Sequence, residues 1–259
     1  MNHAAAELYG SRCRIVAVDP DEVQRVVAHV ECAFDDRTAA IVREFRRDHD
    51  LSQSLRVVLW PRDREPGVTP VSAKPGAAVS PPSTLAIRER VGPLIRAGFR
   101  VTSVSRPHEV LAELAVQQRA DLAIALAFHN DGGCVSAVNH GVPGPRPAYL
   151  EWDAEWCSST AGSGDQLARY QFAAALAPHL RQVIGETPAT GFRILACGSM
   201  DNLRTAMAPL SEEFSREVQV LDHAWPGMLD SEAGTNPTEP ALWQLARAAA
   251  QSAARGRHR

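Results

Sequence analysis

The most informative stretch of the chain covers residues 121–128, which read Asp-Leu-Ala-Ile-Ala-Leu-Ala-Phe and lead directly into His129 and Asn130. An apolar run of this length and density is typical of a β-strand that is buried on both faces, as in the middle of a parallel sheet. A sheet of that kind needs helices to cover it. The stretch therefore predicts an α/β domain.

The sequence on either side alternates between short apolar runs and amphipathic stretches. The expected strands lie at 55–60, 99–105, 148–152, 192–197 and 218–221. The expected helices lie at 84–97, 107–119, 163–185 and 203–216, with a further helix from 238. This alternation favours a three-layer αβα fold with a mostly parallel sheet, and no internal repeat is visible.

Two regions are expected along the chain. Residues 1–52 predict an N-terminal extension with a strand at 13–18, a helix that starts at Asp19-Pro20-Asp21 and a second helix at 36–49. Residues 53–259 form the α/β domain. It contains a Pro-rich loop at 61–83, and loops of that length are often functional.

Composition limits the partners and the compartment. The chain has 259 residues and a net charge of −3, so nothing electrostatic favours nucleic-acid binding. No apolar run reaches the roughly 18 residues of a membrane span, and we expect no membrane partner. The first residues lack a secretory pattern, and the five cysteines include no C-x-x-C pair. We therefore expect reduced thiols and a cytoplasmic location.

Motif absences also count. The sequence has no G-x-x-x-x-G-K loop, no G-x-G-x-x-G after its first strand and no G-x-S-x-G elbow. On this ground we expect no nucleotide cofactor.

Ligands of open α/β sheets bind beyond the carboxyl ends of the strands. Three expected strand ends carry polar residues, at 60–63, 129–133 and 197–202. They supply Asp63, His129 and Cys197 as candidate catalytic residues.

The order of four segments resembles the zinc-dependent N-acetylmuramoyl-L-alanine amidases, a family of cell-wall hydrolases. These segments are 57–67, 84–106, 120–130 and 194–202, within a resemblance that spans 55–210. The resemblance implies an amidase-like fold and a hydrolase acting on a C–N bond. It also implies a zinc ion held by two histidines and a glutamate, with a second glutamate that activates water.

The family's site positions are only partly kept. His129 matches the second zinc histidine, and Asp63 stands at the position of the first. The position of the glutamate ligand falls near Ser80, and that of the catalytic glutamate falls at Ala196 or Cys197. The resemblance therefore names Asp63 and His129 as the metal ligands, within a rebuilt or inactive site.

Cys197 supports a different chemistry. It ends a strand and precedes Gly198-Ser199. If His129 ends a neighbouring strand, its imidazolium would stabilise a nucleophilic thiolate. The alternative is a buried cysteine that acts as a small apolar residue.

The segment from Trp152 to Trp156 gathers two indoles around Asp153 and Glu155 in a chain with few aromatic residues. Indole faces stack on rings and cations, and carboxylates bind amines. We expect Trp152, Trp156 and Glu155, with Asn130 and Asp131, to bind substrate. Ordinary core packing of the indoles is the alternative.

Three functional hypotheses follow. The preferred one is an intracellular enzyme on the amidase-like fold that acts on an amide or amino-acid-like small molecule. The second is a pseudoenzyme, an inactive amidase homologue that binds a muropeptide or a partner protein as a regulator. The third is a metal-independent Cys/His racemase or acyl-transfer enzyme. All three imply a small-molecule or peptide-like partner.

Overall fold

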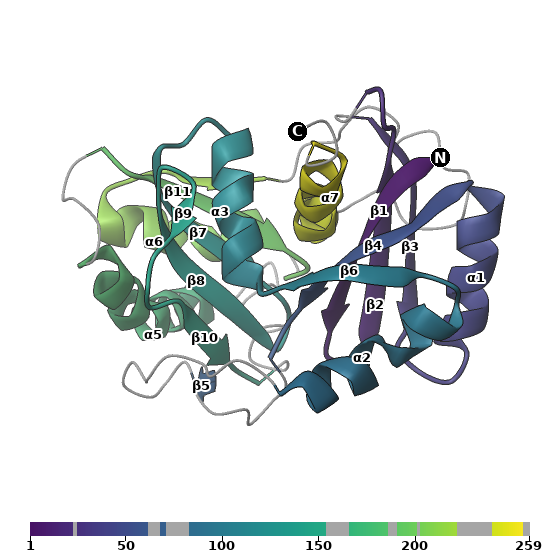
Figure 1. Ribbon diagram of the computed structural model, residues 1–259. Coiled ribbons are helices and arrows are strands. Elements are labelled where there is room, and N and C mark those ends of the chain that lie inside the picture. The colour runs from purple at the N-terminus through teal and green to yellow at the C-terminus, as the bar shows by residue number, and fades with distance from the viewer. Residues whose placement is uncertain are drawn as a thin grey trace. The chain divides into compact units, whose positions relative to one another are not determined.

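The computed structural model describes residues 1–22, 25–61, 68–70, 83–153, 166–185, 191–200, 203–221 and 240–255, with the side chains of 240–243 excepted. The chain divides into two compact units, each described here by itself (Figure 1). Unit 1 comprises Met1–Arg62, Pro81–Val110 and His223–Arg259. Unit 2 comprises Asp63–Ser80 and Leu111–Asp222.

Unit 1 contains a five-stranded sheet in the order β3-β2-β1-β4-β6. Its strands are β1 (Asn2–Tyr9), β2 (Arg12–Val18), β3 (Val26–Ala33), β4 (Leu51–Leu59) and β6 (Arg100–Ser105). The pairs β1–β2 and β2–β3 are antiparallel, whereas β1–β4 and β4–β6 are parallel. The helices are α1 (Thr38–Asp48), α2 (Thr84–Arg96) and α7 (Pro240–Arg255), and α3 (Pro107–Gln117) follows β6.

Alternation along β1 explains the layers of unit 1. Ala4, Ala6 and Leu8 belong to the apolar core that also holds residues of α1 and α2. Successive strand side chains point to opposite faces, so the buried Ala5 and Glu7 face the other side. There α7 packs mainly on β1 and β2. Alanine is the commonest residue of α7, and its small side chain lets the helix approach the sheet closely.

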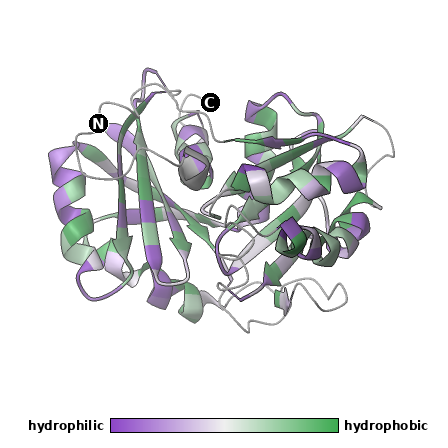
Figure 2. Cartoon of the chain, turned by 180° about the vertical axis from the view of Figure 1, so that it is seen from behind, coloured by the Kyte–Doolittle hydropathy of each residue, from purple (hydrophilic) through white to green (hydrophobic). Residues whose placement is uncertain are grey.

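Unit 2 has a second mixed sheet, in the order β12-β11-β7-β8-β10-β5, with β9 paired to β8. Its strands are β5 (Val68–Pro70), β7 (Leu122–Phe128), β8 (Gly132–Asn139), β9 (Val142–Pro143), β10 (Ala148–Glu151), β11 (Arg193–Gly198) and β12 (Val218–Val220). The helices α5 (Gln166–Ile184) and α6 (Leu203–Phe214) pack against each other. Figure 2 shows the resulting pattern, with largely hydrophobic strands and helices that carry both kinds of residue.

The two units repeat one order of elements. Each begins with three antiparallel strands, continues through a helix to a strand parallel to the first, and passes through another helix to a last parallel strand. The sequence shows no such repeat, so the duplication is one of topology.

The predicted α/β class is confirmed, but the mostly parallel sheet is wrong because both sheets are mixed. Four strands with an antiparallel neighbour, β1, β3, β8 and β9, were not expected. The helix expected after Asp19-Pro20-Asp21 is replaced by β3. Residues 1–52 supply β1, β2, β3 and α1, which lie in the same unit as β4 and β6. Within the described residues, no helix is long and apolar enough to cross a lipid bilayer.

A buried polar network holds the α7 face of the unit 1 sheet. Trp60 donates its indole N–H to Glu7 Oε1 at 2.7 Å, and the Glu7 side chain is 1% exposed. Arg14 lies 3.7 Å from Glu7 Oε2 and donates to Glu31 Oε2 at 3.1 Å. Arg90 donates to the carbonyl of Trp60. Buried charges that lose a partner are costly, which makes the network sensitive to truncation.

We predict that Glu7→Ala lowers the free energy of unfolding by about 3 kcal/mol, because it removes the carboxylate that lies next to the buried Arg14 guanidinium. Urea unfolding followed by circular dichroism measures the change. Glu44→Ala is the matched control, since Glu44 is exposed and lies 3.9 Å from Arg47 on the surface of α1. Equal stability of the two variants would contradict the network's role.

A second prediction concerns pH. Burial lowers the pKa of His29 on β3 and of His108 on α3 below the ordinary value of 6.5, because it penalises the charged imidazolium. The unfolded chain therefore binds more protons than the folded chain as pH falls below about 7, and folding stability declines with falling pH.

The double variant His29→Gln/His108→Gln should lose less stability than the wild type between about pH 7.5 and pH 5.5. Urea unfolding at a series of pH values measures how the free energy of unfolding changes with pH in each protein. A double variant with an unchanged slope would refute the assignment.

Candidate functional site

The carboxyl ends of β7 and β11 form the candidate site in unit 2. These strands are parallel neighbours, and Gly198 at the end of β11 pairs with Phe128 at the end of β7. The residues that follow, Ser199 and His129, therefore leave the sheet side by side. This is the edge at which ligands bind in open α/β sheets.

The His129 side chain is held by Ser199. Its Nδ1 lies 2.5 Å from Ser199 Oγ, and the residue is 1% exposed. The His129 backbone N–H donates to the Gly132 carbonyl at 2.8 Å and closes the turn between β7 and β8. The imidazole thus joins the β7–β8 turn to the segment after β11.

Trp152 supports the same turn from its inner side. Its indole N–H donates to the Asn130 carbonyl at 2.9 Å, and its backbone N–H donates to the Asp131 carbonyl at 3.1 Å. The ring packs edge-on against Phe128 and against Phe172 of α5, with centroids 5.5 and 5.3 Å away. This indole is a buried structural support rather than an exposed stacking surface.

Gly198 permits the close approach of the two strand ends. Its φ is +122°, and an added Cβ would stand 1.9 Å from the carbonyl oxygen of Phe128. The N–H of Met200 donates to that same carbonyl at 3.1 Å. The chain can therefore turn from β11 towards α6 only with a glycine at this position.

Cys197 is fully buried, and its Sγ donates to the Leu126 carbonyl at 3.5 Å. The hydrogen bond of the neighbouring His129 goes to Ser199. All four described cysteines are buried thiols, and Cys13 lies opposite Cys32 on β2 and β3. A hydrogen bond with Cys13 lowers the pKa of Cys32, whereas the same contact and burial raise the pKa of Cys13.

The structure brings together His129, Asn130, Asp131, Trp152 and Cys197, all from the predicted set. Asp63, Glu155 and Trp156 lie outside the described residues, as does the Ser80 position. Among the residues that the structure describes, no group of three His, Cys, Asp or Glu side chains could hold a metal ion. Zinc bound by Asp63 and His129 stays a prediction.

No protein-family model matches the chain, and no curated protein matches it. Solved structures do. Ethanolamine utilization protein EutJ from Carboxydothermus hydrogenoformans has a TM-score of 0.58 at 12% identity, covering 97% of this chain and 89% of that one. The activator of 2-hydroxyisocaproyl-CoA dehydratase from Clostridium difficile has a TM-score of 0.57 at 8% identity, covering 99% of this chain and 95% of that one. A chain of the PilM–PilN type IV pilus biogenesis complex has a TM-score of 0.57 at 11% identity, covering 98% of this chain and 98% of that one.

The fold is actin-like. Identities this low establish the fold of the chain and nothing of its activity.

The resemblance to zinc amidases is therefore wrong. The strands and the helix expected within the segments that carried it do exist, as β4, α2, β6, β7 and β11. The resemblance required a mostly parallel sheet, whereas β7 turns directly into the antiparallel β8. The three functional hypotheses are wrong as well. They are the amidase-like hydrolase, the inactive amidase homologue as a pseudoenzyme, and the Cys/His racemase or acyl-transfer enzyme.

Sequence reasoning missed two parts of the site. The partnership of His129 with Ser199 depends on the register of β7 against β11, which no local pattern encodes. The sequence does show Gly198-Ser199 at the end of an expected strand, but nothing in it indicates the contact of Gly198 with Phe128.

We predict that Gly198→Ala destabilises the protein by about 2–5 kcal/mol, because a Cβ would clash with the Phe128 carbonyl and the backbone would be strained. Gly191→Ala is the control. Gly191 also has a positive φ, of +88°, but nothing lies within 4 Å of an added Cβ. Its expected cost is about 1–2 kcal/mol. Equal losses in urea unfolding would show that the contact with Phe128 is unimportant.

Proposed function

We propose that the chain is an adenine-nucleotide-binding protein that holds the phosphates at the carboxyl ends of β7 and β11. The observation that carries the proposal is the Gly198 turn, which holds the end of β11 against the end of the parallel strand β7, shortly before α6 in the sequence. Strand, glycine turn and helix in this order form a common setting for bound phosphate groups.

The residues present fit such a group. Gly198 lets the end of β11 turn in close contact with the Phe128 backbone, where any side chain would clash. The first N–H groups of α6 have no partners within the helix, and its dipole favours negative charge at that end. Arg204 stands exposed in the first turn of α6 and adds a positive charge. His129 and Ser199 fix the turn between these groups.

The actin-like fold supports an adenine nucleotide in particular. The Clostridium difficile activator, which shares this fold, was solved with bound ADPNP. Transferring that ligand class to this chain is part of the proposal. The expected lack of a nucleotide cofactor rested on missing G-x-x-x-x-G-K and G-x-G-x-x-G loops, which are only two of the ways to bind phosphates.

A bound ATP would bring the free energy of its phosphoanhydride bonds to this site. The role of the described residues is to bind and orient it: the α6 N-terminus and Arg204 take the phosphates, and the His129–Ser199 contact keeps the turn in place. The predicted small-molecule partner is then a nucleotide, and the predicted cytoplasmic location is where ATP is plentiful.

We predict that the full chain binds ATP–Mg²⁺ in isothermal titration calorimetry and that Arg204→Glu weakens the affinity at least about 10-fold. The substitution reverses a charge at the helix N-terminus, and a 10-fold change corresponds to about 1.4 kcal/mol.

Arg146→Glu is the matched control, because it makes the same charge change on an exposed residue of unit 2. Arg146 precedes β10, whose first residue pairs with Val135 and whose last pairs with Gly132 beside the site, so it lies towards the far end of the sheet. Absence of binding at millimolar ATP, or equal weakening by both variants, would refute the proposal.

A further inference from the structure

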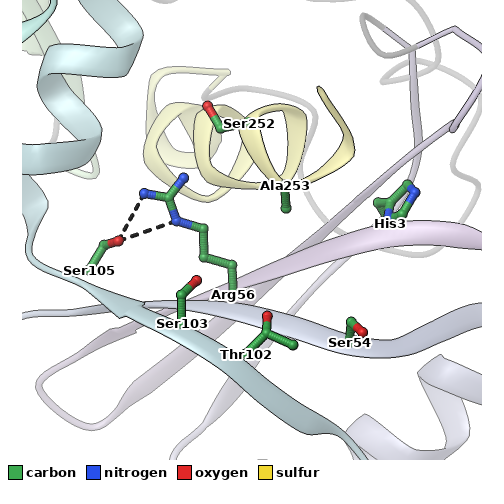
Figure 3. A pocket seen from close by; sticks show the side chains of 8 residues that line it. All are labelled: His3, Ser54, Arg56, Thr102, Ser103, Ser105, Ser252 and Ala253. Atoms are coloured by element: carbon green, nitrogen blue, oxygen red, sulfur yellow. Dashed lines mark hydrogen bonds between the residues drawn. The ribbon is translucent and has the colours of Figure 1, made fainter. Parts of the chain in front are cut away.

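Unit 1 contains a cavity of about 450 Å³ beside α7 (Figure 3). Three strands and one helix contribute to its walls. The lining residues are His3 of β1, Ser54 and Arg56 of β4, Thr102, Ser103 and Ser105 of β6, and Ser252 and Ala253 of α7. Its volume falls within the usual range for small-molecule sites.

The cavity lies where α7 leaves part of the sheet uncovered. α7 packs mainly on β1 and β2 and less on β4, while the sheet continues past β4 to β6. A polar ligand beside α7 would therefore rest on β4 and β6 without displacing the apolar contacts of the helix.

Two irregularities of the sheet coincide with the cavity walls. Opposite β4, the partner in β6 changes from Val101 for Leu55 to Ser103 for Arg56, which leaves Thr102 as an inserted residue. Thr102 Oγ1 donates to the Leu55 carbonyl at 3.2 Å. Bulges redirect side chains and occur often at edges and functional sites. This one places the hydroxyl residues of β6 along the cavity.

The second irregularity surrounds His3. Between Asn2 and Ala4 of β1, the partner in β4 advances from Leu51 to Leu55. The extra length of β4 contains Ser54, which lines the cavity with His3. Both departures from regular pairing thus lie at residues that line the same cavity.

The lining has the chemistry of an anion site. Arg56 donates from Nε and Nη2 to Ser105 Oγ, at 3.2 and 2.8 Å, and Figure 3 shows its guanidinium extending from β4 towards Ser105 and α7. This contact holds the planar fork in one orientation, which suits recognition of oxyanions. The described lining residues carry this one permanent positive charge and no carboxylate.

The remaining walls suit hydroxyl groups. Five lining side chains, Ser54, Thr102, Ser103, Ser105 and Ser252, carry a hydroxyl that can donate and accept. We propose that this cavity binds a small phosphorylated polyol, with the phosphate on Arg56 and the polyol hydroxyls along the serine and threonine side chains. This class combines the anion and the hydroxyls that the walls match.

The test uses sorbitol 6-phosphate as the probe in isothermal titration calorimetry with the full chain. Sorbitol is the uncharged control and inorganic phosphate the anion without hydroxyls. We expect sorbitol 6-phosphate to bind more tightly than either. Arg56→Gln should weaken it at least 10-fold, whereas Arg12→Gln, at an exposed arginine paired with Glu31 on the same sheet, should leave it unchanged.

Ala253→Phe provides a second variant, since it adds a ring to the cavity wall without altering a charge, and it should also abolish binding. Thermal unfolding identifies the variants that fold. Arg204→Glu should bind the probe like the wild type, which separates this site from the proposed nucleotide site. No binding of the probe, equal affinity for sorbitol or phosphate, tighter binding of the carboxylate glycerate, or binding that survives both Arg56→Gln and Ala253→Phe would each overturn the proposal.

Discussion

The contact between Gly198 and the Phe128 carbonyl controls the arrangement of the unit 2 site. The carbonyl accepts a hydrogen bond from Met200, and a Cβ at position 198 would stand 1.9 Å away from it. Because the strand ends meet this closely, His129 and Ser199 emerge within hydrogen-bond distance. A side chain at position 198 would therefore disturb the backbone and the imidazole together.

The aromatic cluster under the turn completes this constraint. Phe128, Trp152 and Phe172 pack edge to face, and the two hydrogen bonds from Trp152 reach the backbone of Asn130 and Asp131. The turn is thus held from the sheet, from α5 and from the segment after β10. Such support keeps a binding surface preorganised, because its groups lose little freedom when a ligand arrives. Trp152 contributes through this support and not through an exposed face.

The sequence predicted the parallel half of each sheet better than the antiparallel half, and the reasons are local. Strand-end reasoning placed His129 and Cys197 at one edge, but not the His129–Ser199 contact, which follows from strand register. The alanines of β1 favour a helix over a strand, so their local preference did not indicate β1. Before β3, the Asp19 carboxylate accepts hydrogen bonds from the backbone N–H groups of Asp21 and Glu22, as it would at the start of a helix. In this protein the same hydrogen bonds stabilise a turn. The antiparallel strands distinguish the actin-like fold from an amidase, so missing them produced the wrong family.

The two units show how one topology can hold different chemistry. On the α7 face of unit 1, charged side chains are buried in a network around Glu7 and Arg14, and the polar cavity forms farther along β4, where pairing with β1 and β6 is irregular. In unit 2 the β7–β11 pairing is regular up to Gly198, and the polar groups gather beyond the strand ends. A bulge redirects the side chains on the face of a sheet, whereas regular parallel strands bring together the residues that follow their carboxyl ends. The two proposed sites differ in this way: the unit 1 cavity lies where strand pairing is irregular, and the unit 2 site lies beyond strands whose pairing is regular.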